Sequence, residues 1–324
     1  MTNDAQNIHI LWGTPHSLYT GKIRSYLLKK GIDFRELCPS HPRFRAEITP
    51  VIRLKVAPVI ETADGQILQD TGDMIAYFEK HYPANLMIPN TPVQRTIAEL
   101  IGAFGSEGML PIAMSYRWSY RAEQESFLRA EFGRGVYAGY DRDDRNAAGL
   151  KLMNYFNNFL PILGVNQNSK STIETAYFDL LEALDIHFQH YPYIMGGLPS
   201  IADFGLMAPL YAHLARDPVP AMLMKNKAPN VYRWTERMNL ASIADCEFPD
   251  CPETFFPNDA IPETLDAVLK IIFQDWAPEL SVNAEIYNAW VTKNSDLPAG
   301  TLVAENGQRS VHPTLGPIEY LLRG

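Results

Sequence analysis

Cysteine is scarce in this chain of 324 residues. Only Cys38, Cys246 and Cys251 occur, with no CxxC pair and no histidines at zinc-finger spacing. So small and odd a number argues against a disulfide scaffold and a structural zinc site, and it is typical of a reducing compartment. We therefore expect a cytoplasmic protein in which the cysteines serve mainly as small apolar residues.

Positive charge is also in short supply. The sequence holds 28 lysines and arginines against 37 aspartates and glutamates, a formal net charge of −9. With no basic block to offset it locally, this balance argues against nucleic acid or an anionic membrane as a partner. The N-terminus, MTNDAQNIHI, lacks the basic start and apolar core of a secretory signal, and no stretch approaches the roughly 18 apolar residues of a membrane helix.

What the sequence does contain is an α/β order near its start. The apolar run 8–11, IHIL, stands before a turn with Gly13 and Pro15 and predicts a buried strand. Residues 18–30 have apolar side chains at helical spacing and are followed by Gly31, which predicts a helix with a left-handed glycine cap. The alternating segment 32–37 predicts a second strand, parallel to the first because a helix connects them.

A hairpin and another helix complete this region. Segment 57–70, APVIETADGQILQD, has β-rich runs on either side of Asp64-Gly65, which is a strong hairpin signal. Residues 72–81 carry a further apolar stripe, and prolines between 82 and 92 end the pattern. The order β-α-β then β-β-α predicts a small α/β sandwich of thioredoxin-like architecture over residues 6–84.

We predict an all-helical domain over residues 92–240, because apolar residues recur there at helical spacing and do not alternate with polar residues as in a strand. The clearest helix covers 171–188. Ser171 and Glu174 predict a capping box at its start, and its apolar residues share one face. This helix is therefore expected to lie in the core.

Two further segments of this region have readable patterns. A second capping box, Ser200 with Asp203, opens a helix that Pro209 should kink. The mixed-charge run 141–145, DRDDR, is expected to be a solvated loop rather than a metal or phosphate site, because its charges satisfy one another and water.

The last part of the chain, residues 241–324, begins with a proline-rich stretch. Two helices are predicted, 262–276 and 278–293, each opened by proline. Asn306-Gly307 lies between β-capable runs in 301–311, so we predict a small hairpin with a type I′ turn there.

Four separate segments carry a resemblance to a known family. Segment 17–24, SLYTGKIR, resembles the active-site segment of the cytosolic glutathione transferases, commonly Ser or Cys, then Pro, an aromatic and a small polar residue before Lys-Val-Arg. Leu18 stands where proline is common. Ala57-Pro58 is similar to that family's cis-proline step, Asp70-Thr71 to its acidic-hydroxyl pair, and Ser200–Asp203 to its C-domain capping box.

The resemblance implies a fold and a set of partners. It implies an N-terminal thioredoxin-like α/β domain over 6–84, an all-helical glutathione-transferase C-terminal domain over 92–240, and a C-terminal extension over 241–324. The extension exceeds the usual family length and is similar to the tails of uncharacterised bacterial members. Glutathione is implied as co-substrate, no metal is implied, and a homodimer is expected.

The implied chemistry requires glutathione sulfur as a thiolate. A free thiol has a pKa near 8.5 and is only about 3% ionised at pH 7, whereas lowering that pKa by about 2 units stabilises the anion by roughly 2.7 kcal/mol. Ser17 at the helix mouth is assigned this role, with ordinary N-capping as the alternative. Tyr19 is the second candidate and has helix packing as its alternative, while Thr20 and His16 are weaker.

The other matched residues are expected to bind the tripeptide. A cis bond at Pro58 would turn the Ala57 backbone toward the cysteinyl unit for strand-like pairing. Asp70 would take the γ-glutamyl ammonium, and Thr71 with the following helix amides would receive its carboxylate. Plain strand and capping roles are the alternatives.

The acceptor is expected to be a small apolar electrophile bound by the helical domain. Run 109–120, MLPIAMSYRWSY, suggests Tyr116 and Tyr120 as pocket residues, with core packing as the alternative for each. A non-catalytic glutathione-binding protein is the alternative function. Thiol-disulfide exchange ranks third, because no cysteine occupies the Ser17 region and Cys38 should lie at the far end of a strand.

Overall fold

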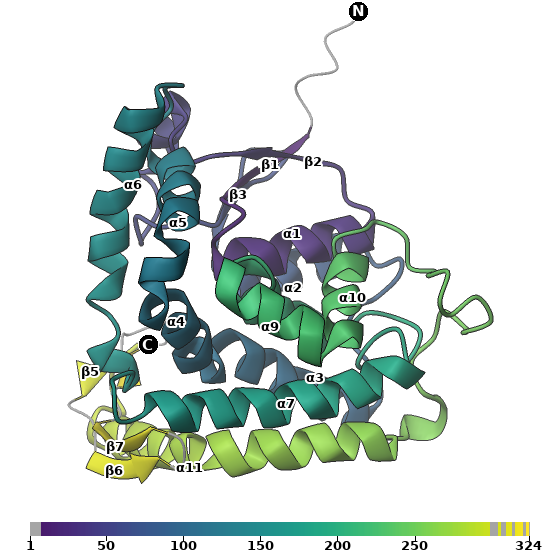
Figure 1. Ribbon diagram of the computed structural model, residues 1–324. Coiled ribbons are helices and arrows are strands. Elements are labelled where there is room, and N and C mark those ends of the chain that lie inside the picture. Colours follow the sequence, from purple (N-terminus) through teal and green to yellow (C-terminus); the bar gives the residue numbers. More distant parts are fainter. Residues whose placement is uncertain (1–7, 299–303, 306–308, 313–314, 320–321, 324) are drawn as a thin grey trace, which may run out of the picture.

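The computed structural model describes residues 8–298, 304–305, 309–312, 315–319 and 322–323 (Figure 1). Its first part has the predicted thioredoxin-like order: β1 (His9–Trp12), α1 (Leu18–Lys30), β2 (Phe34–Leu37), the π-helical turn η2 (Phe44–Ile48), β3 (Val59–Glu61), β4 (Ile67–Gln69) and α2 (Thr71–His81). The strands form one sheet in the order β2-β1-β3-β4.

The sheet brings three chain segments to one edge. β1 and β2 are parallel, with Trp12 opposite Leu37, while β3 is antiparallel to β1, with Val59 opposite Trp12. β4 is antiparallel to β3 and pairs Gln69 with Val59. The end of β1, the start of β3 and the end of β4 therefore meet, and α1 and α2 both begin beside that edge. The predicted hairpin around Asp64-Gly65 is confirmed.

The second part is helical, as predicted. It contains α3 (Pro92–Ala103), η3 (Phe104–Gly108), α4 (Leu110–Ser119), α5 (Arg121–Val136), α6 (Arg142–Asn157), η4 (Pro161–Leu163), α7 (Lys170–His190), α8 (Ile201–Pro209), η5 (Leu210–Ala215), α9 (Pro218–Lys227) and α10 (Pro229–Met238). The segment 141–145 is not a loop: Asp141 caps α6 through bonds from the amides of Asp143 and Asp144. In Figure 1, α5 and α6 stand side by side and reach the level of the sheet.

The helix α7 confirms the predicted core face but not the predicted cap. Ala183, His187 and every residue of the predicted apolar stripe are buried, the stripe being Ile173, Tyr177, Leu180, Leu181, Leu184 and Phe188. The N-cap residue is Ser169, so the helix begins two residues before Ser171, the cap that the sequence predicted. Glu174 accepts a hydrogen bond from the Tyr120 hydroxyl instead of from the helix start.

The helix α8 packs unusually closely against α3 and η3. The predicted capping box of Ser200 and Asp203 is present, and the helix changes to the π-helical η5 after Pro209. A Cβ on Gly205 would lie 2.3 Å from the carbonyl oxygen of Gly102. Glycine at this crossing therefore permits backbone-to-backbone contact.

The helix α1 joins the two domains. Ile23, Tyr26 and Leu27 are fully buried. Ser25, on another side of the helix, donates to the carbonyl of Met238, with 2.8 Å between the oxygens. Burial on more than one side explains why the helix has no clean polar face.

The lysines that end α1 are also held inside the protein. Lys29 donates to the Tyr193 hydroxyl over 3.0 Å, and Lys30 forms an ion pair with Glu79 at 2.8 Å. Burial lowers the pKa of Lys29 to about 8. Both side chains therefore bridge elements as well as neutralising the helix end.

The helical segment from α3 through η3 to α4 is long and apolar. Residues 92–119 are long and apolar enough to cross a membrane by length and composition. However, 56% of the relevant window is buried inside the protein. This burial is typical of a core helix.

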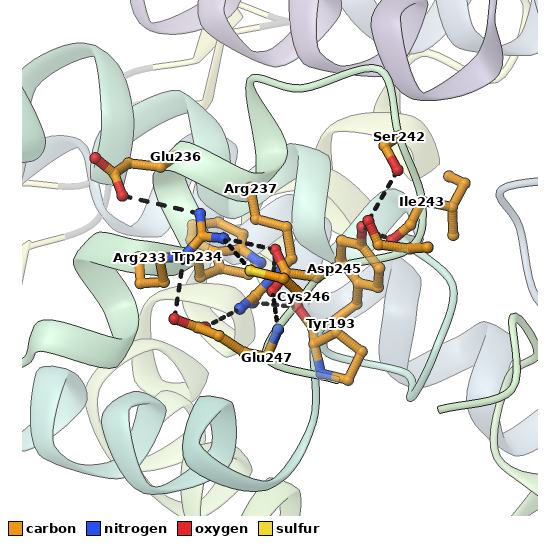
Figure 2. A network of polar contacts seen from close by, with 12 residues as sticks. Tyr193, Arg233, Trp234, Glu236, Arg237, Ser242, Ile243, Asp245, Cys246 and Glu247 are labelled. Atoms are coloured by element: carbon orange, nitrogen blue, oxygen red, sulfur yellow. Dashed lines mark hydrogen bonds and ion pairs between the residues drawn. The ribbon is translucent and has the colours of Figure 1, made fainter. Parts of the chain in front are cut away.

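The extension begins with a loop fixed to α10 by ion pairs (Figure 2). Arg233 and Arg237 both pair with Asp245, at 2.8 and 3.0 Å, and Arg237 also pairs with Glu247 at 2.9 Å. The Tyr193 hydroxyl donates to the Ile243 carbonyl over 2.7 Å. Residues 242–247 are thus an ordered part of the structure.

The rest of the extension differs from the prediction. After the short η6 (Pro257–Asp259), the two expected helices form one, α11 (Glu263–Lys293), which continues through Pro278 and lies along α7 (Figure 1). Proline removes its own amide and its ring crowds the carbonyl four residues earlier, which here belongs to the exposed Gln274. Water can therefore replace the missing bond.

The terminal strands do not pair as predicted either. β5 (Ala304–Glu305) pairs with β8 (Leu322–Arg323), and β6 (Arg309–His312) pairs with β7 (Gly316–Glu319). The expected hairpin between β5 and β6 is therefore wrong, although a small hairpin does form from β6 and β7. The turn that the sequence predicted for the hairpin of 301–311, Asn306-Gly307, lies outside the described residues.

Candidate functional site

Ser17 lies at the start of α1, as predicted, and it is the N-cap of that helix, which was the alternative role. Its amide donates to the Thr14 carbonyl over 3.1 Å, which closes the turn between β1 and the helix. The first intrahelical bond runs from the Gly21 amide to the Ser17 carbonyl, so the amides of Leu18 and Tyr19 lie before it. The Ser17 hydroxyl accepts only a long bond, 3.4 Å, from the Thr20 amide, and its proton can still be donated.

Asp70 and Thr71 begin α2 at the same edge. Asp70 has a positive φ of 83° and accepts the Gly72 amide through one carboxylate oxygen at 2.7 Å. A left-handed backbone is uncommon for a residue other than glycine, and it is often found at functional sites. Asp70 is exposed, while Thr71 is buried.

Pro58 precedes β3 at this edge, and the Ala57–Pro58 peptide bond is cis, which confirms the prediction for its geometry. Pro58 is buried and Ala57 is half-buried. The structure therefore brings together Ser17, Ala57-Pro58 and Asp70-Thr71.

The Tyr19 hydroxyl is bonded to η3 of the helical domain. It donates to the Ser106 carbonyl and to the Glu107 carboxylate, each at 3.1 Å. Burial, followed by the neighbouring charge of Glu107, raises the pKa of Tyr19. The phenol therefore keeps its proton and joins α1 to η3 instead of packing in the core with the rest of the predicted stripe.

The basic side chains of Lys22 and Arg24, both on α1, make different contacts. Lys22 donates to the Ser106 hydroxyl over 3.0 Å, and burial lowers its pKa against the opposing pull of Asp70 and Glu107. Arg24 instead forms an ion pair with Glu36 beyond the site. Lys22 and Glu107 thus place opposite charges next to the first turn of α1.

The weaker hydroxyl and imidazole candidates face inward. The Thr20 hydroxyl is fully buried and accepts the Thr14 amide at 3.4 Å. His16 is buried, and its ring lies 4.4 Å from the ring of Phe132, centroid to centroid. Burial, with the charge of Arg117 next, holds the pKa of His16 well below its usual range, so the ring is neutral.

Arg117 is the residue at this site that the sequence motifs missed. It lies on α4, is only 2% exposed, and forms a bidentate ion pair with Asp217 at 2.6 and 2.9 Å. It also donates to the carbonyl of His16 over 3.0 Å. The available signal was a single arginine inside an otherwise apolar, aromatic run.

Tyr116 and Tyr120 lie against α7. Tyr116 contacts Tyr177 with 5.0 Å between the ring centroids, and the Tyr120 hydroxyl donates to Glu174. Both contacts belong to the helical core rather than to the Ser17 turn, which agrees with the core-packing alternative. Their role as acceptor residues stays a prediction.

Cys38 is not at the far end of a strand from Ser17. It follows β2, whose last carbonyl, that of Leu37, accepts the Gly13 amide at 2.9 Å. Because β1 and β2 are parallel, Cys38 lies at the same sheet edge as the Ser17 turn. Burial raises the pKa of the Cys38 thiol, which disfavours the nucleophilic thiolate.

The described residues contain three free cysteines and no group of histidine, cysteine or acidic side chains suited to hold a metal ion.

The chain matches the family "Glutathione S-transferase, N-terminal domain" over residues 11–86 and "Glutathione S-transferase, C-terminal domain" over residues 148–240. Together these matches cover more than half of the sequence. The protein belongs to the glutathione S-transferase family.

Solved structures with a similar chain path include a glutathione S-transferase from Rhodospirillum rubrum F11, at 15% identity and a TM-score of 0.43, covering 81% of this chain and 99% of that chain. The beta-etherase LigF from Sphingobium sp. strain SYK-6 is 17% identical, with a TM-score of 0.46, and covers 71% of this chain and 94% of its own. FzlA from C. crescentus is 14% identical, with a TM-score of 0.45, and covers 81% and 99%. A comparison with curated proteins found no match.

Proposed function

We propose that this protein is a glutathione transferase in which Ser17 holds the sulfur of glutathione as a thiolate for attack on a small apolar electrophile. The observation that carries the proposal is the start of α1, where the Ser17 hydroxyl and the amides ahead of the first intrahelical bond share one turn. Such a turn favours a bound anion. The Ser17 hydroxyl would keep its proton and donate a hydrogen bond to the thiolate sulfur, and the proton of the thiol would pass to solvent.

The remaining matched residues supply tripeptide binding in this proposal. The Ala57 backbone pairs with the cysteinyl unit, as an added strand would. Asp70 receives the γ-glutamyl ammonium with the oxygen that does not cap α2, and Thr71 with the α2 amides receives the carboxylate.

The chemical step then needs little more from the protein. The thiolate sulfur forms a bond to the electrophilic carbon, and the leaving group departs with the electrons of the bond that breaks. The acceptor pocket is assigned to the helical domain, with Tyr116 and Tyr120 as its candidate residues. Free cysteines fit a cytoplasmic setting, where glutathione keeps thiols reduced.

The proposal is tested by calorimetric titration with glutathione and by the ultraviolet absorbance of the bound thiolate as a function of pH. We expect Ser17→Ala to raise the pKa of the bound thiol by about 1–2 units and to lower kcat/KM by roughly 10–100-fold. Thr20→Val is the matched control, because that buried hydroxyl faces away from solvent, and it should leave the thiol pKa unchanged.

Each alternative has its own outcome. No binding at millimolar glutathione would remove both the enzyme and the assigned site. Binding without conjugation across a panel of electrophiles would favour the non-catalytic glutathione-binding protein. The expected homodimer is checked separately by light scattering.

A further inference from the structure

Arg117 sits at the centre of a buried polar network between the two domains. A guanidinium has five N–H donors, and all five of Arg117 are used: one Nε and one Nη2 donor on Asp217, the other Nη2 on the Ala212 carbonyl, and the two Nη1 donors on His213 and the His16 carbonyl. The guanidinium therefore has one orientation.

The partners of Arg117 are fixed in turn. His213 is buried; its Nε2 is 2.5 Å from an Arg117 nitrogen and its Nδ1 is 3.2 Å from the Ala113 carbonyl. Burial, followed by the charge of Arg117, holds the pKa of His213 well below its usual range. The neutral ring thus accepts from Arg117 and donates to α4, while the nearly fully buried Asp217 balances the charge.

The hydrogen bond from Arg117 to the His16 carbonyl holds the backbone next to Ser17, the residue on which the proposed chemistry depends. The peptide between His16 and Ser17 is bonded on both sides: its carbonyl accepts from Arg117 at 3.0 Å, and its amide donates to Thr14 at 3.1 Å. Because a peptide unit is planar, these two bonds fix its rotation. The backbone that carries the Ser17 hydroxyl is fixed with it.

We propose that Arg117 is a positioning residue, which holds the His16–Ser17 peptide from the helical domain so that the Ser17 hydroxyl and the first amides of α1 point at the bound sulfur. The inference rests on the proposed function of Ser17. This role differs from packing. An apolar pair in place of Arg117 and Asp217 could still join α4 to α9, but it could not donate a hydrogen bond to the His16 carbonyl.

The test uses the full-length protein and two variants. Arg117→Lys keeps the charge but cannot bond Asp217 and the carbonyl with one planar group. The double variant Arg117→Met with Asp217→Asn removes both charges, so that no unpaired charge is buried and folding is retained. We expect both variants to raise the pKa of the bound glutathione thiol by about one unit, which lowers the ratio of thiolate to thiol about tenfold. We expect kcat to fall by a similar factor. The glutathione dissociation constant should stay within about twofold, because the Ala57 and Asp70 contacts are untouched.

Arg237→Lys is the matched control. Arg237 is equally buried and ion-paired, but its partners are Asp245, Glu247 and the Pro192 carbonyl (Figure 2). Its variant should lose stability and keep the wild-type thiol pKa.

The outcomes separate the two proposals. A wild-type thiol pKa in the folded double variant would overturn the role of Arg117 and leave that of Ser17 intact. An equal pKa change in Arg237→Lys would reduce Arg117 to a structural residue. Failure of the wild-type protein to bind glutathione would remove both proposals together.

Discussion

Two hydroxyls in the first turn of α1 have different surroundings. That of Ser17 makes one long contact with a backbone amide and lies where helix amides converge, whereas that of Tyr19 is committed to Ser106 and Glu107 on the helical domain. Sequence alone ranks the two by motif position. Their hydrogen-bond partners favour Ser17 as the sulfur ligand.

Tyr19→Phe tests this ranking. The variant should leave the pKa of bound glutathione thiol unchanged, because the phenol bonds protein groups, and it should lose about 1 kcal/mol of unfolding free energy with those bonds. Thiolate absorbance against pH and urea unfolding measure the two quantities. A thiol pKa raised as much as in Ser17→Ala would move the role to Tyr19.

The pairing of elements explains where the sequence patterns succeeded and failed. The capping box of α8, the β3–β4 hairpin and the glycine cap of α1 are signals contained in a few neighbouring residues, and all are present. The predictions for the 141–145 loop, the start of α7, the division of α11 at Pro278 and the pairing of the terminal strands were wrong. The strands β5 and β6 pair with β8 and β7, partners that no short motif records.

The close crossing of α8 with α3 and η3 requires glycine at position 205. Gly205→Ala should cost about 1–3 kcal/mol of unfolding free energy, because its Cβ would meet the backbone of Gly102 at 2.3 Å and no rotamer change can relieve the clash. Denaturant unfolding measures the loss. Gly65→Ala has no atom near the added Cβ, so it serves to isolate the cost of a positive φ alone. A loss no larger than in that control would contradict the close crossing.

At the scale of the whole molecule, buried neutral histidines make the fold sensitive to acid. His187 bridges Thr264 on α11 and the Tyr193 carbonyl, and burial lowers its pKa from 6.5 to about 4. In this range the unfolded state binds a proton that the folded state does not, so stability falls as the pH falls. The buried His16 and His213 have pKa values displaced in the same direction.

His187→Gln tests the contribution of His187 to this acid sensitivity. Between pH 7 and pH 4 the variant should lose about 3 kcal/mol less unfolding free energy than the wild type, because a depression of about 2.5 pKa units corresponds to that amount. Urea unfolding at a series of pH values measures it. Parallel curves for the two proteins would show that His187 titrates normally in the folded state.

The sequence by itself determined the two-domain class of fold and the segments that carry the site. Ser17, Ala57-Pro58 and Asp70-Thr71 were singled out by their resemblance to glutathione transferase motifs, each of which is contained in a few neighbouring residues. The tertiary structure decided which groups meet those segments: Glu107 takes the Tyr19 hydroxyl and Arg117 bonds the His16 carbonyl. The physical reason is that such partners lie many residues apart, and only the packing of helix faces brings them within hydrogen-bond distance.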